Sequence, residues 1–476
     1  MLGRTQRVHF VGIGGIGMSG IAELLSNLGF AVSGTDLRMS EAALRLRAMG
    51  VRIALGHDAA HAAGADVVVY SSAVRPDNPE IVEAHRRRVP VIPRAEMLAE
   101  LMRLRSGIAV AGAHGKTTTT SMVALVLERA GLDPTAVIGG RLSAFGSNAR
   151  LGRGEWMVAE ADESDRSFLR LTPTVAVLTN IDREHLEAYR DFDDLRQAFL
   201  DFANKVPFYG AVVACLDDAH VGGLVPAMTR RVITYGLDAG GADVRGVDVT
   251  HEGLEWGCRV EAGEGLARAI GVAGKLPSPL CELRLPVPGR HNLQNALAAV
   301  AVGLELGIDA ATVAGALASF RGADRRFQEI GEAGGVLVID DYGHHPAEIK
   351  AVLDAARASL GRRLIVAFQP HRYTRTALLL GEFGPALAQA DEVVLTEIYA
   401  AGEDPIPGVT AEALAAAVAP HVGGRVRLAQ TLDDVVAEVR ALARPGDAVI
   451  TLGAGSIGTI GQRLLDALAG GEGGRA

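Results

Sequence analysis

A short glycine-rich run, Gly112 to Thr117, has the residue types that bind nucleotide phosphates. It follows an apolar stretch at 108–111 and precedes a helical pattern, so backbone N–H groups and a helix N-terminus meet there. Lys116 supplies a positive charge for phosphate oxygens, and the Thr117 hydroxyl suits Mg²⁺. Val110 stands where the ordinary phosphate-loop pattern has its first glycine, which shortens the loop but keeps its chemistry. The candidate phosphate contacts are Gly112, Ala113, His114, Gly115, Lys116, Thr117 and Thr118.

Two polar runs follow the next apolar strand patterns. Glu160 to Asp165 comes after a strand that ends at 159, and Glu160, nearest to the strand, is the candidate metal ligand. Thr179 to His185 follows the stretch 175–178, and His185 is a candidate metal ligand or phosphate contact. A solvated acidic loop and an exposed loop histidine are the alternative interpretations.

A second glycine-rich turn, Gly12 to Gly17, directly follows the first apolar strand pattern. Asp36 ends the next strand pattern, 19 residues after Gly17, where a dinucleotide-binding fold holds a ribose. The turn therefore predicts a nicotinamide cofactor, a mononucleotide or nucleotide-sugar diphosphate, or a tight turn without a ligand. The same pattern recurs at 453–458, which weakens the dehydrogenase interpretation. The candidates in the first turn are Gly12, Gly14, Gly15, Ile16, Gly17 and Asp36.

Two further polar clusters end strand patterns near the C-terminus, at 340–346 and 369–375. Ligands of open α/β sheets lie outside the carboxyl ends of the strands. We therefore expect the two clusters to form one site, on neighbouring strand ends, for a carboxylate and an amine. The candidates are Tyr342, His344, Arg372 and Arg375.

Two smaller features complete the candidate set. Asn292 and Asn295 share one face of a helix and are expected to contact a nucleotide or to cap the helix. Arg325 lies between the second and third blocks of the chain, where an arginine can reach a γ-phosphate, although a solvated linker is the alternative.

The elements that position these residues alternate between strand and helix, which predicts parallel sheets. Strands are expected at 8–11, 31–35, 67–70, 108–111, 157–159, 175–178, 336–341, 364–369, 392–396 and 448–452. Helices are expected at 16–28, 117–130, 293–306 and 309–319, and a small antiparallel sheet within 244–288. The fold class is α/β with three domains, 1–107, 108–322 and 323–476, the outer two Rossmann-like and the central one a phosphate-loop domain.

Composition limits the class of protein. The chain has 476 residues and a formal net charge of −9, with no basic block, so nucleic acid is not expected as a partner. Three scattered cysteines predict no disulfide framework, and a reducing cytoplasm fits. No secretion signal and no apolar run of 18 residues is visible, so no membrane association is expected. The sequence does not indicate the oligomeric state.

Taken together, these motifs resemble the Mur ligase family over residues 7–462. The stretches that carry the resemblance occur in the family's order and spacing. They are Gly112–Thr117, Glu160–Asp165, His185, His291-Asn292 and Arg325-Arg326, with His9–Gly20, Asp340–Pro346, Phe368–Arg375 and Glu397–Glu403 narrowing the match to one branch. Ala113 departs from the family, which usually has Thr or Ser there. Lys205 is not assigned the carbamylated-lysine role of other branches.

The resemblance implies an ATP-dependent ligase with UDP-N-acetylmuramate and L-alanine as substrates and an acyl phosphate as intermediate. It implies that the first glycine turn holds the UDP diphosphate, and that Mg²⁺ is bound by Thr117, Glu160 and His185. Lys116, Asn292, Asn295 and Arg325 would contact ATP, and Tyr342, His344, Arg372 and Arg375 the alanine. The implied catalytic residues are Lys116, His185, Arg325, His344 and Arg372, with His344 expected as general base because an imidazole titrates near neutrality.

Three alternatives remain open at this stage. A relative that reattaches recycled murein peptides would share the motifs and prefer a tripeptide to alanine. A dehydrogenase would bind a nicotinamide cofactor at Gly12–Gly17. A nucleotide-gated binding module would bind without chemistry.

Overall fold

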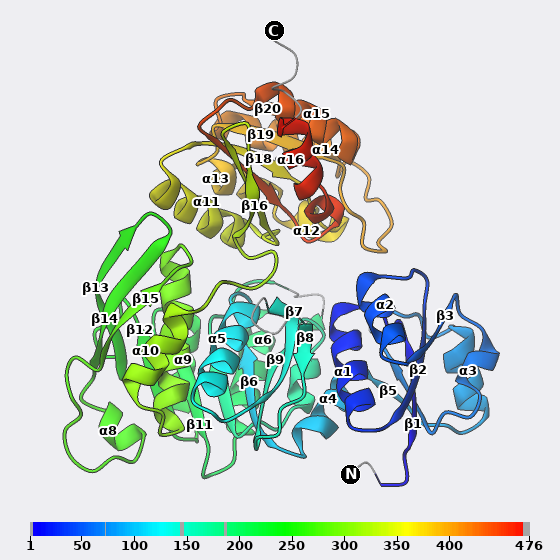
Figure 1. Ribbon diagram of the computed structural model, residues 1–476, viewed down its shortest axis with the longest axis vertical. Coiled ribbons are helices and arrows are strands. Elements are labelled where there is room, and N and C mark those ends of the chain that lie inside the picture. Colours follow the sequence, from blue (N-terminus) through cyan, green and yellow to red (C-terminus); the bar gives the residue numbers. More distant parts are fainter. Residues whose placement is uncertain (1–2, 72, 143–146, 185–187, 470–476) are drawn as a thin grey trace. The chain divides into compact units, whose positions relative to one another are not determined.

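The structure is a computed structural model that describes residues 3–71, 73–142, 147–184 and 188–469. The chain forms two compact units (Figure 1). The first comprises Met1–Val249, Cys258–Arg284 and Leu293–Arg321, and the second comprises Thr250–Gly257, Leu285–Asn292 and Gly322–Ala476. The first unit contains two sheets and the second contains one, which gives the expected three-domain α/β organisation. The domain boundaries at 107 and 322 stay predictions.

The first sheet is parallel, with the strand order β3-β2-β1-β4-β5. Its central strand β1 is buried from Val8 to Val11, as expected for a strand that is covered on both faces. The glycine turn that follows β1 therefore lies at the carboxyl edge of the sheet. The strands are β1 Arg7–Val11, β2 Ala31–Asp36, β3 Arg52–Leu55, β4 Val67–Tyr70 and β5 Val91–Pro93; the helices are α1 Ile16–Asn27, α2 Glu41–Ala48, α3 Pro79–Arg86 and α4 Arg94–Met102.

The second sheet has ten strands in the order β15-β14-β13-β12-β11-β10-β6-β9-β7-β8. Strand β6 lies between β9 and β10 and is parallel to both, so the polar runs after these three strands share one edge. The strands are β6 Ser106–Ala111, β7 Thr135–Leu142, β8 Ser147–Arg150, β9 Trp156–Ala161, β10 Val175–Leu178, β11 Ala211–Cys215, β12 Val232–Gly236, β13 Val244–Glu252, β14 Glu255–Ala262 and β15 Cys281–Leu285. The helices are α5 Lys116–Arg129, α6 Phe192–Asn204, α7 Ala219–Leu224, α8 Leu266–Ala269, α9 Arg290–Glu305 and α10 Ala310–Ala318.

Helix α5 is buried along most of its length, from Thr117 to Leu127. It packs against strands β6, β7 and β9 on one side and against helix α10 on another. A helix enclosed in this way is fixed by close packing rather than by its own propensity. The phosphate loop at its N-terminus is therefore attached to a rigid element.

The third sheet has the order β16-β17-β21-β18-β19-β20; β16 is antiparallel to β17 and the other pairs are parallel. The strands are β16 Gln328–Ala333, β17 Val336–Asp341, β18 Arg363–Phe368, β19 Glu392–Thr396, β20 Val426–Ala429 and β21 Asp447–Leu452. The helices are α11 Pro346–Leu360, α12 Tyr373–Leu378, α13 Leu380–Leu387, α14 Ala411–Val418, α15 Leu432–Leu442 and α16 Gly461–Ala469.

The structure confirms the expected strands and long helices and corrects two details. Residues 244–285 do not form a separate small sheet, because β13, β14 and β15 extend the ten-stranded sheet. The polar clusters after β17 and β18 do not follow adjacent strands, because β21 lies between them. Strands β3, β5, β7, β8, β11, β12, β16 and β20 were not predicted. Strands β3, β5 and β20 are short, but β11 is wholly apolar and buried and was missed all the same.

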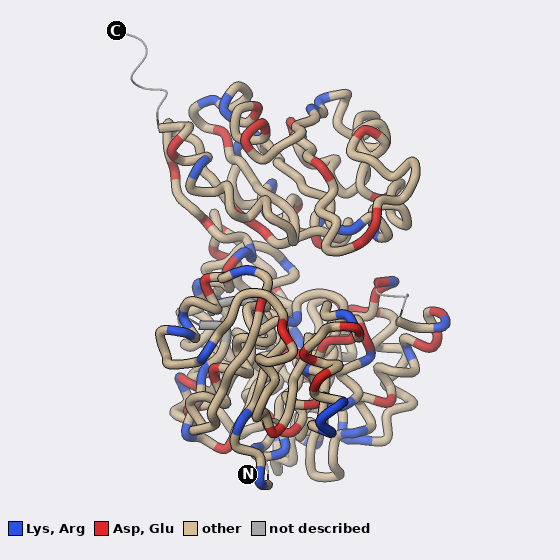
Figure 2. Tube along the Cα trace, turned by 90° about the vertical axis from the view of Figure 1, so that its right-hand side faces the viewer, with Lys and Arg blue, Asp and Glu red and all other residues tan. Residues whose placement is uncertain are grey.

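Charge and helix length limit what the surface can do. In the described part of each unit, Figure 2 shows Lys and Arg interspersed with Asp and Glu. Because Lys and Arg form no separate basic surface there, an anionic ligand must be attracted by individual cationic side chains at its binding site. Among the described residues, no helix combines the length and apolarity that a bilayer span requires.

Candidate active site

The end of strand β10 holds the phosphate loop in place. The Asn180 side chain accepts a hydrogen bond from the His114 N–H at 2.8 Å, and the Thr179 hydroxyl donates to the His114 carbonyl at 2.7 Å. Gly115 has a left-handed φ of 79°, which favours glycine, and directly precedes α5. No described side chain caps α5 at Gly115. The first N–H groups of the helix are therefore suited to phosphate oxygens.

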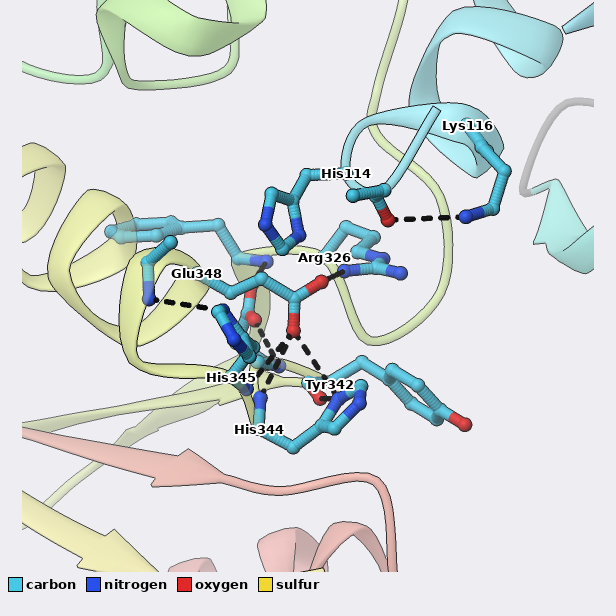
Figure 3. A network of polar contacts seen from close by, with 12 residues as sticks. His114, Lys116, Arg326, Tyr342, His344, His345 and Glu348 are labelled. Atoms are coloured by element: carbon cyan, nitrogen blue, oxygen red, sulfur yellow. Dashed lines mark hydrogen bonds and ion pairs between the residues drawn. The ribbon is translucent and has the colours of Figure 1, made fainter. Parts of the chain in front are cut away.

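Lys116 turns its ammonium group back onto the loop, as Figure 3 shows. Its Nζ donates to the backbone oxygens of Gly112 and Ala113 and to both carboxylate oxygens of Glu163, at 2.8 and 3.0 Å. Burial lowers the pKa of Lys116, but Glu163 and its acidic neighbours more than compensate and raise the pKa above its ordinary value. The lysine therefore stays charged.

Two of the expected metal ligands, Thr117 and Glu160, belong to the described residues and lie at the carboxyl edge of the second sheet. Strand β9 pairs with β6 so that Glu160 stands opposite Val110, and the Glu160 Oε1 accepts a hydrogen bond from the Gly139 N–H. Thr117 lies in the first turn of α5. Carboxylate and hydroxyl oxygens are the donors that Mg²⁺ prefers, so this set fits the ion. His185 lies outside the described residues, and its role stays a prediction.

The first glycine turn is closed by the carboxylate expected to hold a ribose. Asp36 Oδ2 accepts a hydrogen bond from the Gly14 N–H at 2.8 Å, and the Ser40 hydroxyl donates to the Gly14 carbonyl at 3.1 Å. Gly12 and Gly15 are joined by a backbone hydrogen bond, and Ile16 begins α1. Asp36 thus stabilises the turn itself in this structure.

Arg94 is a residue that sequence reasoning missed. It begins α4, and a Cβ added to Gly17 would lie 2.3 Å from Arg94 Nη1, so the guanidinium lies directly against the glycine turn. Arg94 Nη2 also contacts Asp162 Oδ2 at 3.2 Å, in the acidic run after β9. One arginine therefore joins the glycine turn of the first sheet to the acidic loop of the second. No motif marks it.

The polar cluster after β17 is a connected network in the second unit (Figure 3). Glu348, in the first turn of α11, accepts hydrogen bonds from the His344 and His345 N–H groups at 3.1 and 3.4 Å. Its other oxygen lies 3.4 Å from Arg326 Nη1. The Arg326 guanidinium also lies over the Tyr342 ring, 5.2 Å from its centroid. Arg326 and Glu348 were not selected individually from the sequence.

The clusters after β17 and β18 lie together, as expected, although β21 separates their strands. The His344 and His371 ring centroids are 5.6 Å apart, and His371 stacks on Tyr399 at 5.5 Å. Arg375 Nη1 donates to the His371 carbonyl at 3.4 Å. Arg372 precedes α12 with a left-handed φ of 72°, and its N–H donates to the Tyr399 carbonyl.

The second glycine turn, at 453–458, makes room for Arg325. The Arg325 Nε donates to Asp340 Oδ2 at 2.8 Å, and its Nη2 donates to the Gly453 carbonyl. A Cβ on Gly458 would lie 2.3 Å from Arg325 Cζ. Arg325 therefore packs against the second glycine turn within the unit, and its contact with ATP stays a prediction.

The two candidate amides of α9 have different neighbours. Asn295 lies against the phosphate loop, since a Cβ on Gly115 would be 2.6 Å from its Oδ1. The Asn292 side chain donates to the Pro288 carbonyl at 2.7 Å. The geometry therefore places Asn295 beside the loop, and the contact of either amide with ATP stays a prediction.

Burial dominates the titration of His344 and His371. Together with the charge of Arg375, it lowers the pKa of His344 to about 3 and that of His371 to about 4. Burial raises the pKa of Asp341, at the end of β17, to about 6. Burial therefore argues against a His344 that titrates near neutrality, and its role as general base stays a prediction. With a pKa near 3, it holds a proton far more weakly than an α-amine of pKa about 8.

Three family models match successive parts of the chain. Residues 7–106 match the Mur ligase family catalytic domain, 110–303 the Mur ligase middle domain, and 325–455 the Mur ligase glutamate ligase domain. Together the three models cover each of the sheets described above.

Curated relatives and solved structures match nearly the whole chain. The UDP-N-acetylmuramate–L-alanine ligases of Geotalea uraniireducens and of an Anaeromyxobacter species are 52% and 53% identical, covering 99% and 98% of this chain and 100% and 98% of theirs. The crystal structure of the UDP-N-acetylmuramate-alanine ligase from Thermotoga maritima has a TM-score of 0.81 at 31% identity, covering 97% of this chain and 98% of that one. A murein peptide ligase from Psychrobacter arcticus has a TM-score of 0.73 at 25% identity, with 98% and 99% covered.

The buried histidines predict a loss of stability in acid. A folded pKa below the ordinary value of about 6.5 means that the unfolded chain binds the proton more tightly. The stabilisation by neutral His371 is therefore complete above pH 6.5 and is lost as the pH falls toward 4. We expect the free energy of unfolding to drop between pH 7 and pH 5 by about 2 kcal/mol more in the wild type than in His371→Gln.

Urea unfolding of the full chain at several pH values measures this difference. The matched control is His220→Gln, in the first unit. Parallel pH curves for the wild type and His371→Gln would show that His371 does not stay neutral when the protein is folded.

Proposed function

This chain belongs to the Mur ligase family, and we propose that it joins L-alanine to the lactyl carboxylate of UDP-N-acetylmuramate with ATP as the energy source. The observation that carries the proposal is the identity of 52–53% with ligases of that name over essentially the full length of both chains. The similarity to the murein peptide ligase of Psychrobacter arcticus is lower, at 25%. The proposed reaction is therefore alanine addition rather than peptide recycling or hydride transfer.

The proposed reaction has two steps, and both accumulate negative charge on oxygen. The lactyl carboxylate attacks the γ-phosphorus of ATP, which gives an acyl phosphate and ADP. The alanine amine then attacks the acyl carbon, and inorganic phosphate leaves from a tetrahedral intermediate. Such transfers are accelerated by positioning and charge stabilisation, which Lys116 and the N-terminus of α5 supply.

Mg²⁺ completes the phosphate site in this proposal. Thr117, Glu160 and His185 would hold it, and it would supply neutralisation of phosphate charge. The fit of the Thr117 and Glu160 oxygens to a hard cation supports the assignment. Lys116 would contact the phosphate oxygens directly through its ammonium group.

The remaining substrates are assigned to the other two sheets. The N-terminal turn at Gly12–Gly17 would bind the UDP diphosphate, with Asp36 shaping the turn and Arg94 as an additional cation beside it. The alanine carboxylate would pair with Arg372 or Arg375, and Tyr342 and His344 would border its amine. His344 is then a neutral hydrogen-bond partner of the amine rather than a base that titrates near neutrality. Reaction in the cytoplasm fits soluble, nucleotide-linked substrates.

Phosphate release tests the proposed function directly. With ATP, Mg²⁺ and UDP-N-acetylmuramate present, we expect release to depend on L-alanine and to be faster than with the murein tripeptide at equal concentration. Lys116→Ala should lower the rate roughly 10²–10³-fold, because one preorganised donor to the transferring group is lost. Faster turnover with tripeptide would assign the chain to peptide recycling, and alanine-independent turnover would remove the ligase assignment.

The alanine site generates a separate prediction. Arg375→Ala should raise the KM for alanine strongly and leave the KM values for ATP and UDP-N-acetylmuramate nearly unchanged, because a bidentate carboxylate contact is lost. Hydroxylamine trapping without alanine should still yield the acyl hydroxamate in this variant. Arg427→Ala, which breaks an exposed pair with Glu438 in the same unit, is the control. Loss of the trapped product would mean that Arg375 serves the phosphate.

A further inference from the structure

Glu163 binds the ammonium group of Lys116, the cation that is expected to act on phosphate. The two carboxylate oxygens lie 2.8 and 3.0 Å from Lys116 Nζ, and the Glu163 side chain is only 3% exposed. The backbone of Glu163 is anchored as well, because its carbonyl accepts hydrogen bonds from the Tyr189 hydroxyl and the Arg166 N–H. The carboxylate is therefore a fixed partner rather than a mobile side chain that happens to lie nearby.

The surroundings of this pair carry an excess of negative charge. Asp162 and Glu184 both act on the Lys116 ammonium, in addition to Glu163. Arg94 forms an ion pair with Asp162. Burial alone would raise the pKa of Asp162, but the charges of Lys116 and Arg94 lower it below its ordinary value. Counting these five groups alone, two cations face three carboxylates. The balance is acidic even while Lys116 points at Glu163.

Nucleotide binding must disturb this balance. To reach a triphosphate, the ammonium has to turn away from Glu163, which leaves a buried carboxylate close to several phosphate charges. Breaking a buried ion pair from one side is strongly unfavourable unless another cation replaces the one withdrawn. The carboxylate oxygens of this edge suit a divalent cation, which replaces the lost charge.

From this geometry, and given the proposed ATP-dependent function, we infer that Glu163 is a positioning residue that makes phosphate capture by Lys116 conditional on a divalent cation. Without the cation, Glu163 retains the lysine and the loop binds nucleotide poorly. With the cation, the lysine is released to the phosphates. The role differs from that of a metal ligand, because Glu163 acts through Lys116.

Nucleotide affinity, measured with and without metal, tests the inference. The full chain is titrated calorimetrically with ATP in Mg²⁺ and again in EDTA. Glu163→Gln keeps the size of the side chain and removes its charge. We expect it to bind metal-free ATP about tenfold more tightly than the wild type, while affinity in Mg²⁺ changes less, since couplings between contacting groups have this order.

Two further variants separate this role from a structural one. Glu163→Asp keeps the charge and should restore the metal dependence. Lys116→Met combined with Glu163→Gln should abolish the metal-free gain, because the gain passes through the lysine. Glu96→Gln, which removes a half-exposed partner of Arg170, is the matched control and should bind like the wild type.

The outcomes distinguish the inference from the proposed function. Suppose that the wild type binds ATP in Mg²⁺, and that the ratio of ATP affinities with and without metal is the same in Glu163→Gln as in the wild type. Glu163 then has no such role, and the ligase proposal stands. If Glu163→Gln gains metal-free affinity equally in the Lys116→Met background, the effect does not act through the lysine and the inference fails. Absence of ATP binding by the wild type in Mg²⁺ would overturn the proposed function itself.

Discussion

The ion pair between Lys116 and Glu163 sets the arrangement at the carboxyl edge of the central sheet. It joins the N-terminus of α5 to the loop after β9, and both elements are fixed by the order of strands on either side of β6. The mostly buried ammonium of Lys116 is stabilised by the fixed carboxylate of Glu163. In the inferred mechanism, the phosphate loop binds nucleotide only when that ammonium is released from Glu163. The chemistry of nucleotide binding is therefore tied to the charge balance of one small, mostly buried cluster.

In the second unit, the arrangement of the polar clusters depends on the room available at the end of strand β21. The polar clusters after β17 and β18 meet across the end of β21, where a glycine turn lies against Arg325 and against Tyr399, the ring that stacks on His371. Burial of the histidines then keeps them neutral. A neutral imidazole beside arginines can orient an amine while leaving the arginines for a carboxylate.

The features of the fold and of the candidate site that are encoded by residues close together in the sequence could be predicted. The phosphate loop and the first glycine turn each combine a strand, glycines and a helix start within about 20 residues, and their positions were correct. The contacts of Glu163 with Lys116 and of Arg94 with Asp162 span 47 and 68 residues and depend on which strands are neighbours. The insertion of β21 between β17 and β18 has no local signal either. Burial, which moves the pKa of His344 away from neutrality, is likewise a property of the folded chain.

The proposed reaction requires the lactyl carboxylate to be activated by phosphorylation before the amine attacks. The most direct measurement uses UDP-N-acetylmuramate labelled with ¹⁸O in that carboxylate, with ATP, Mg²⁺ and L-alanine, and mass analysis of the released phosphate. An acyl phosphate intermediate transfers one ¹⁸O atom to each phosphate released during amide formation. Phosphate that carries no ¹⁸O while the amide product accumulates would contradict the account.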